Sequence, residues 1–299
     1  GVRQLGVTLN LVCYLSNFLV LGIETTSTET GGWVRNKICV SIAGLNVEIV
    51  QEPEFINARK SDLGGQFVES TKLIVKNFDE SDIDAVVEVV EKISVLLSFA
   101  TCSEVSFYAW NIEGTNKSHI WTTRGKYYYF RPPFCCVDSS HIKHLIESCF
   151  DTYSTLYEQR SLNVVVDIFN TPEVNNLQIE LKLATLFILL ENLKSSYAKC
   201  KGYKYKNGSY WSESNEKYYF QTLLYEMFSS VGMEVGLKEI KNLRNEIIHS
   251  GLSHLPYDEQ RRIYATCRDL VTEYILRLIG YKGIFNPYES RGVQPKKIA

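Results

Sequence analysis

The sequence predicts a mixed α+β protein, with an N-terminal α+β region that contains an antiparallel sheet and an all-α C-terminal half. In the first half, residues 37–52 alternate apolar and polar side chains with period two, which is typical of strands with one buried face. In the second half, residues 177–199 and 257–279 repeat apolar side chains at helical spacing. The 299-residue chain is 45% hydrophobic and 22% charged, and this composition excludes a disordered or fibrous protein.

Strand and helix signals alternate along the first half. Residues 7–23 are expected to form two buried strands that meet near Ser16-Asn17, and residues 37–52 form strand material broken at Gly44. The other elements expected in this half are a strand at 71–76, a helix at 79–99, a strand at 104–112 and a hairpin at 118–131 that turns at Arg124-Gly125.

Helical periodicity dominates the second half. The expected helices are one that begins at Ser139-Ser140 and those at 177–199, 218–230, 237–248 and 257–279. The β-branched run at 162–169 favours a strand by propensity but lies between helices, so its state stays open. We expect a loop at 201–215 and a frayed tail after Tyr281. The predicted domains are residues 1–140 and 141–283, followed by a tail at 284–299.

Cysteine usage and charge indicate the compartment and the kinds of partner. The eight cysteines contain no CxxC pair, which predicts free thiols in a reducing cytoplasm. Polar side chains interrupt the apolar residues 7–23, so we expect neither a membrane span nor a signal peptide there, and no membrane partner. The net charge of −2 excludes a polybasic nucleic-acid coat, whereas 15 Lys and Arg against 11 Asp and Glu from Lys201 onward are compatible with contacts to phosphates.

The familiar catalytic signatures are missing from the sequence. It contains no GxxxxGK[ST], GxSxG, HExxH or GxGxxG motif and no regular metal-ligand spacing of Cys and His. His141 and His144 could share a metal ion on one helix face, but no third ligand stands nearby. The aromatic run at 127–130 could stack on bases, although packing in a sheet explains it better. We therefore expect no cofactor and no metal.

A polar set at the end of the predicted helix 237–248 stands out. Asn245 lies one turn before His249 on the same face, and Arg244 is rotated by about 140° from His249. The helix dipole favours an imidazolium in the last turn, and Gly251 can end the helix. An exchangeable proton beside a permanent cation and an amide suits phosphodiester chemistry. The alternative is an ordinary helix end that carries polar residues.

The segment Arg244-Asn245-Glu246-Ile247-Ile248-His249 resembles the Rx4-6H motif of HEPN domains. HEPN domains are helical bundles in which this motif sits late and a long helix follows, as residues 257–279 do here. The run Leu186 to Leu193, which contains Glu191, is similar to the early HEPN helix that carries an acidic residue. The arrangement looks most like the Apea-like HEPN group, and the resemblance covers roughly residues 140–280. It implies a HEPN-like bundle as the C-terminal domain.

This resemblance implies a metal-independent endoribonuclease that cuts RNA by attack of the RNA's own 2′-hydroxyl. His249 would be the acid and base, Arg244 the phosphate and transition-state clamp, and Asn245 an orienting polar group. Glu191 would support Arg244, although a structural helix acid is a common alternative. The implied partners are an RNA substrate, a second copy of the chain, and an antitoxin or other regulatory partner in a toxin or phage-defence system.

Two further expectations follow from the resemblance and the geometry. Other HEPN domains are non-catalytic modules that dimerise or bind nucleic acid or protein, and this alternative stays open here. Because Arg244 and His249 point apart, one protomer presents a poor composite site, whereas a two-fold axis at the helix end can bring two of each together. We therefore expect a homodimer whose interface includes residues 244–251 and forms one basic, anion-binding cleft.

Overall fold

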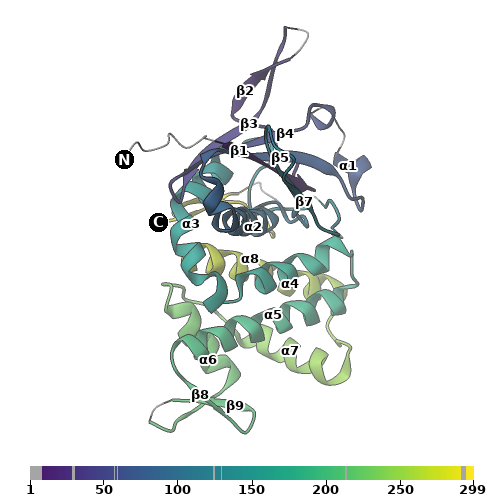
Figure 1. Ribbon diagram of the computed structural model, residues 1–299. Helices are drawn as coiled ribbons and strands as arrows, with labels where there is room; N and C mark the ends of the chain where they lie inside the picture. The colour runs from purple at the N-terminus through teal and green to yellow at the C-terminus, as the bar shows by residue number, and fades with distance from the viewer. Residues whose placement is uncertain are drawn as a thin grey trace, which may run out of the picture. The chain divides into compact units, whose positions relative to one another are not determined.

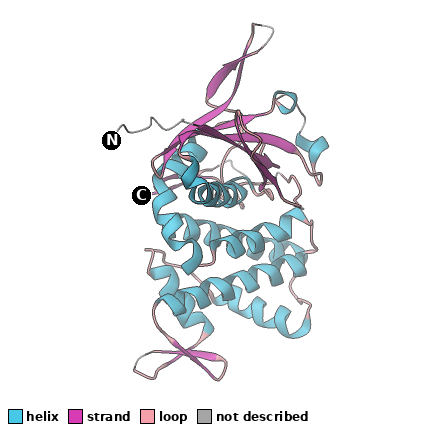
Figure 2. Cartoon of the chain, viewed as in Figure 1, coloured by secondary structure: helices cyan, strands magenta, loops and turns pink. Residues whose placement is uncertain are grey.

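The computed structural model describes residues 9–28, 31–56, 58, 60–123, 125–128, 130–212, 214–290 and 294–299. The chain divides into two units, residues 1–151 and 152–299. The division falls within α3 (Ser140–Gln159), whereas the boundary predicted from the sequence stood at the start of this helix. Strands dominate the first unit and helices the second (Figure 2). No helix among the described residues is both long and apolar enough to cross a membrane.

The first unit is built on an antiparallel sheet. Its order is β2-β3-β4-β5-β1-β6-β7, and every neighbouring pair is antiparallel, as the sequence predicted. The strands are β1 (Leu9–Ser16), β2 (Glu24–Ser27), β3 (Trp33–Ile42), β4 (Leu45–Gln51), β5 (Glu69–Phe78), β6 (Ser106–Ile112) and β7 (Ser118–Ile120). The helix α2 (Ile83–Thr101) runs beneath the sheet in Figure 1 and buries Val86, Val90, Ile93 and Leu97.

Short helical segments complete the first unit: η1 (Pro53–Phe55), α1 (Lys60–Leu63) and η2 (Glu80–Asp82). The β3–β4 pair confirms the break expected at Gly44, because Ala43 and Gly44 turn the chain with φ values of 49° and 75°. This two-residue turn pairs Ile42 with Leu45 and puts the apolar residues of both strands on one buried face.

Two strand predictions in the first unit are wrong. Residues 9–23 contain one strand, because the chain turns at Asn17 (φ 62°), whose Nδ2 donates to the Glu104 carbonyl (2.8 Å) and whose Oδ1 accepts from the Val68 amide (2.9 Å). The expected hairpin at 118–131 does not form, since β7 pairs with β6 and Tyr127 donates its amide to the Gln66 carbonyl instead. Arg124, the expected turn residue, lies outside the described residues.

The second unit is mainly helical and is organised around α5 (Ile179–Cys200). This helix contacts α4 (Leu162–Val174), α6 (Phe220–Ser229), α7 (Lys238–Ser250) and α8 (Tyr257–Leu278). Its side chains Leu183, Leu186, Phe187 and Leu190 are buried, which confirms the central helix predicted from the sequence. The ambiguous run at 162–169 is helical, because Leu162, Val165, Val166 and Phe169 bury one face at helical spacing.

Two small sheets were not expected in the second unit. The predicted loop at 201–215 contains β8 (Lys204–Lys206) and β9 (Ser209–Trp211), which form an antiparallel sheet with β10 (Lys217–Tyr218). The tail, expected to fray, pairs β11 (Gly283–Phe285) with β12 (Lys296–Ile298) and buries Phe285 and Ile298. The Asp269 carboxylate on α8 accepts the backbone amides of Tyr288 and Glu289, so the tail is held by polar as well as apolar contacts.

A buried carboxylate ties α4 to α5, α8 and the tail. Glu173 is 0% exposed and accepts hydrogen bonds from Tyr264 Oη (2.7 Å), Tyr288 Oη (2.9 Å) and Lys182 Nζ (3.0 Å). Burial raises its pKa, but Arg268, Tyr264 and Lys182 outweigh burial and hold the pKa below its ordinary value. A charged network in the core of the second unit therefore joins α5, which carries Glu191, to α4, α8 and the tail.

Candidate functional site

The candidate site is formed by α7 and the helix it packs on, α5. Ile240, Leu243 and Ile247 are buried at spacings of three and four residues, so α7 presents one apolar face to the bundle and leaves its polar residues at the surface. Gly251 ends the helix with a φ of 75°, and its amide donates to the Ile247 carbonyl at 2.8 Å. The sequence predicted this face and this end correctly.

The structure brings Arg244, Asn245 and Glu191 together. Arg244 Nη2 lies 2.7 Å from Glu191 Oε1, and Nη1 donates to Asn245 Oδ1 at 3.0 Å. The guanidinium also stacks over the Phe220 ring, 4.8 Å from its centroid. Lys194 pairs with the other oxygen of Glu191 and lies 4.9 Å above the same ring. Glu191 thus anchors two cations and fixes the direction of Arg244, across 53 residues of sequence.

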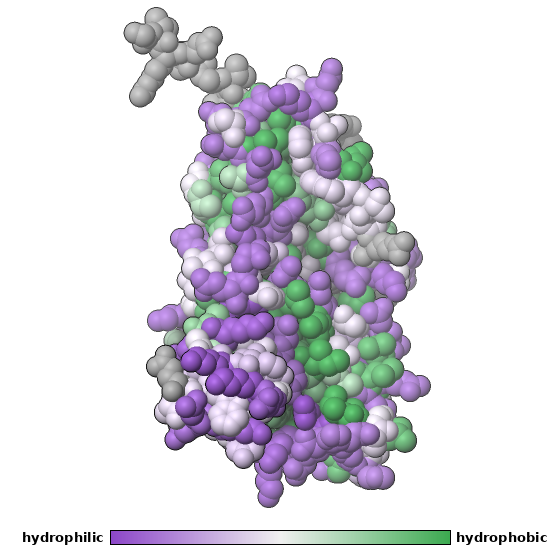
Figure 3. Space-filling model, turned by 60° about the horizontal axis from the view of Figure 1, so that its bottom comes forward, coloured by the Kyte–Doolittle hydropathy of each residue, from purple (hydrophilic) through white to green (hydrophobic). Residues whose placement is uncertain are grey.

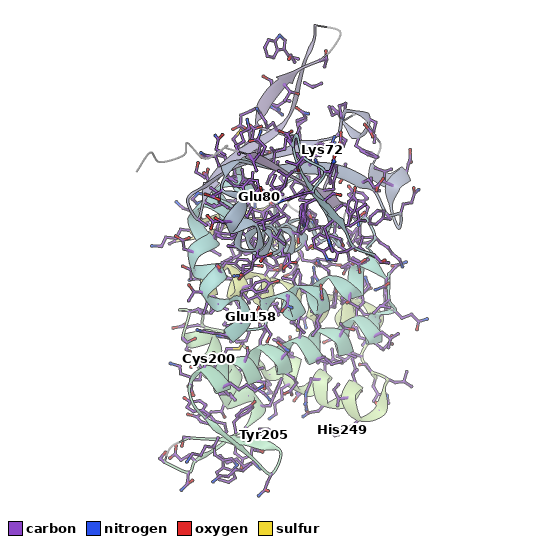
Figure 4. The ribbon with its side chains drawn as sticks, in the orientation of Figure 1. Lys72, Glu80, Glu158, Cys200, Tyr205 and His249 are labelled. Carbon is purple, nitrogen blue, oxygen red and sulfur yellow. The ribbon has the colours of Figure 1, made fainter. Side chains whose placement is uncertain are left out.

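His249 lies apart from this cluster. Its side chain is exposed at the end of α7, and no hydrogen bond to its imidazole is found in the described part of the chain. Figure 4 labels His249 on α7. Its neighbours Ile248 and Leu252 are 45% and 66% exposed. His249 is not among the residues that line the cavity next to Arg244, so one protomer does not bring these two side chains to that cavity.

Arg244 and Glu191 instead face a cavity of about 850 Å³ in the second unit. The cavity lies among α5, α6, α7 and the β8–β10 sheet. Five tyrosines line it: Tyr203, Tyr205, Tyr210, Tyr218 and Tyr219. Four cations line it as well, Lys194, Lys199, Lys217 and Arg244, with Glu191 as the carboxylate. Figure 3 turns this end of the unit forward and shows polar surface beside exposed apolar side chains.

Tyr203, Tyr205 and Tyr210 escaped the sequence prediction because residues 201–215 were expected to form a loop. Asn207-Gly208 between Tyr205 and Tyr210 carried the missed signal, since an Asn-Gly pair flanked by aromatic residues is typical of a two-residue hairpin turn. Both turn residues have positive φ, 50° and 74°, and Lys206 pairs with Ser209 across them. This hairpin places Tyr205 and Tyr210 at the cavity.

Among the described residues, no three His, Cys, Asp or Glu side chains gather as a metal site would require. His141 and His144 lie on the first turns of α3, where His141 is partly buried and His144 exposed. The structure adds no third ligand to this pair, in the part of the chain that it describes.

Comparisons with known proteins returned no match. No protein-family model matches the chain, and neither does any curated protein or solved structure.

Proposed function

We propose that the chain is a metal-independent endoribonuclease of HEPN type that works as a homodimer in the cytoplasm, in a toxin–antitoxin or phage-defence setting. The observation that carries the proposal is the ion pair between Glu191 on α5 and Arg244 on α7, with the exposed His249 five residues further along α7. An acid on the central helix that holds the motif's arginine is the arrangement the HEPN resemblance implies.

The chemistry assigned to these residues is transfer of a phosphodiester within the RNA. The 2′-oxygen attacks the adjacent phosphorus while the bond to the 5′-oxygen breaks, which leaves a 2′,3′-cyclic phosphate and a 5′-hydroxyl. One imidazole takes the proton of the 2′-hydroxyl and a second returns a proton to the leaving oxygen, so two His249 side chains serve better than one. Arg244, oriented by Glu191 and Asn245, stabilises the charge that develops on the phosphate.

The dimer brings the second histidine. Ile248, Leu252 and Tyr257, which flank His249 in the sequence, are 45%, 66% and 61% exposed. A two-fold axis at this end of α7 would bury each of them twice in one isologous contact. Cysteines introduced by Leu252→Cys should therefore crosslink between protomers, and a chain that stays monomeric in light scattering at working concentration would contradict the dimer. An antitoxin that covers the basic cleft would be the regulatory partner.

Cleavage of structured RNA in EDTA tests the activity. Wild-type protein should yield products that end in 2′,3′-cyclic phosphate, and His249→Ala should lose the activity by about a hundredfold or more, the usual contribution of a general acid or base. His144→Ala is the matched control, because His144 is exposed on α3 and lies outside the segment 244–257 that the dimer would use. Undiminished cleavage by His249→Ala, or a requirement for a divalent ion, would refute the mechanism.

The alternative is a non-catalytic HEPN module that dimerises or binds nucleic acid or protein. The separation of His249 from the cavity that Arg244 lines favours it, because a binding pocket needs no exposed histidine. On this alternative, Arg244→Ala and His249→Ala leave the biological activity intact while the fold is preserved. Loss of activity in either folded variant would reject it in favour of the nuclease.

A further inference from the structure

The first unit has a smaller cavity of its own, with a volume of about 180 Å³. Strand β3 and the end of β4 form one side of it, and the segments 19–21 and 136–137 form the other. Its apolar lining includes Leu19, Val20, Leu21, Phe55, Cys136 and Val137. Two polar residues among those described also line it, Arg35 on β3 and Gln51 at the end of β4. The cavity therefore combines apolar walls with one cation and one amide.

Contacts within the first unit fix these walls. The Leu21 amide donates to the Cys136 carbonyl at 2.8 Å, and Ser139 Oγ donates to the Leu21 carbonyl at 2.6 Å. Leu19 is 3% exposed and belongs to a buried cluster against which Phe55 packs. The walls are thus in place before any ligand arrives, which is usual for small-molecule sites.

Gln51 brings a buried amide to the cavity. Its side chain is on the same face of β4 as the buried Val47 and Ile49, at a position where alternation calls for an apolar residue, and the residue is 8% exposed. Its backbone carbonyl accepts from Asn36 Nδ2 at 3.0 Å, but its side-chain amide makes no hydrogen bond with any described residue. Because a buried polar group without a partner is costly, this amide indicates a ligand that bonds to it.

Arg35 brings a cation to the cavity. It is exposed and forms no ion pair within the described part of the chain. Asp138 follows the lining residue Val137, but its carboxylate is already engaged: hydrogen bonds from Ser140 chiefly lower its pKa, and Arg35 contributes only through its charge. The Arg35 guanidinium is therefore available to a second carboxylate, the group that its paired N–H donors match best.

The size of the cavity limits the ligand. Its volume of about 180 Å³ is below the range of about 300 to 1,000 Å³ that is typical of drug-sized ligands and cofactors. An apolar cavity of about 150 Å³ can hold a molecule of the size of benzene. The apolar part of a fitting ligand therefore has about six non-hydrogen atoms.

We propose that this cavity binds a small apolar carboxylic acid, with its hydrocarbon part between the apolar walls and its carboxylate between Arg35 and Gln51. The guanidinium donates to one oxygen and Gln51 Nε2 to the other, so the buried amide gains its partner. The acid is either free or the last residue of a polypeptide, since both present a carboxylate beside an apolar group. A pure hydrocarbon would leave the Gln51 amide unpaired, and Arg35 would repel an amine. The site does not rest on the proposed nuclease activity, because it needs neither α7 nor a dimer.

Ligand-observed NMR titrations of the full chain test the site with 4-methylpentanoate, its neutral amide, and the peptide acetyl-Gly-Gly-Leu with a free carboxylate. Arg35→Gln should weaken binding of the acid by about tenfold or more and leave the affinity for the neutral amide unchanged. Gln51→Leu should also weaken the acid by about tenfold. The melting temperature of the ligand-free Gln51→Leu variant should not fall, because an apolar side chain replaces a buried amide without a partner. Lys126→Gln is the matched control, since it removes the same charge from an exposed residue of the first unit that does not line the cavity.

Binding of either acid that falls in both variants and holds in the control establishes the site, and the tighter probe tells a free acid from a polypeptide terminus. Arg35→Gln changes an exposed side chain, so it decides the question if Gln51→Leu fails to fold. The proposal is overturned if neither acid binds at about 10 mM, if acetate competes as well as 4-methylpentanoate, or if the neutral amide binds as tightly as the acid. Equal loss of binding in Lys126→Gln would also overturn it, because a general charge effect would then explain the result. RNA cleavage without acid binding would reject this site and leave the nuclease standing.

Discussion

Replacing Glu173 by alanine should destabilise the second unit by about 3 to 5 kcal/mol near neutral pH, the usual cost of removing one partner from a buried ion pair. The carboxylate is 0% exposed, and its removal leaves Lys182 Nζ and the hydroxyls of Tyr264 and Tyr288 without their acceptor. It also removes a carboxylate that offsets the charge of Arg268, which is 1% exposed.

The magnitude can be checked from the separate contacts. A hydrogen bond to a charged group contributes about 1.5 to 3 kcal/mol, and three such bonds sum to more than the expected loss. Part of this lost free energy is recovered, because the two tyrosine hydroxyls can bind water that enters the space left by the carboxylate. At about 2 to 4 °C per kcal/mol for a unit of this size, the melting temperature should fall by roughly 6 to 20 °C.

The pH dependence follows from the lowered pKa of Glu173. Because the pKa in the folded state lies below the ordinary value of 4.5, the carboxylate contributes its full stabilisation above about that pH. This stabilisation is lost as the pH falls through the folded-state pKa. Glu173→Gln keeps an acceptor for the hydroxyls but cannot titrate, so it should cost less than alanine and flatten the acid side of the stability profile.

Urea denaturation, monitored by hydrogen exchange in peptides of α4, α5 and α8, measures the change in the unfolding free energy of the second unit. Glu158→Ala is the matched control, because Glu158 is an exposed glutamate of the same unit (Figure 4). The control should change the unfolding free energy by less than about 0.5 kcal/mol. If Glu173→Ala lowers the unfolding free energy by less than about 1 kcal/mol, Glu173 is not the partner of a buried ion pair, because removal of one such partner costs about 3 to 5 kcal/mol.

Burial raises the pKa of Asp269 from 3.8 to about 6, so the folded state binds its proton more tightly than the unfolded chain does. The unfolding free energy should therefore fall as the pH rises from about 4 to about 6. In urea titrations, Asp269→Asn should not show this fall. Gly208→Ala meets no atom within 4 Å but must keep a φ of 74°, so it should cost about 1 to 2 kcal/mol, measured by faster hydrogen exchange in the β8–β9 hairpin. A double-mutant cycle on Glu191 and Arg244 should give a coupling of about 1 kcal/mol, because both side chains are partly exposed; a coupling near zero would contradict the anchoring role of Glu191.

The sequence determined the elements whose signals are local. The alternation of Ile38, Val40 and Ile42 predicted β3, and the break at Gly44 predicted the turn that follows it. Helical periodicity predicted α5, α7 and α8, and Gly251 predicted the end of α7. Each of these rests on residues within a few positions of one another, where backbone geometry and the need to bury one face leave few choices.

The tertiary structure decided which of these elements meet. Strand β1 pairs with β5 and β6, about 60 and 95 residues away, and local pattern carries no information on such a choice of neighbour. The run at 162–169 had the propensity of a strand, but α5 offered it an apolar face, and burial against α5 outweighed propensity. The described residues of the tail are held by contacts far away in the sequence, since Asp269 accepts the backbone amides of Tyr288 and Glu289.

The candidate site divides in the same way. The sequence singled out Arg244, Asn245 and His249, because they share one helix end, and the HEPN resemblance added Glu191. That Glu191 pairs with Arg244, and that His249 points elsewhere, depends on how α7 packs on α5. The cavity depends further on the β8–β9 hairpin folding beside α5. The helices and the hairpin pack so that the whole unit exposes little apolar area. This area depends on all segments together, so no single segment of the sequence predicts it.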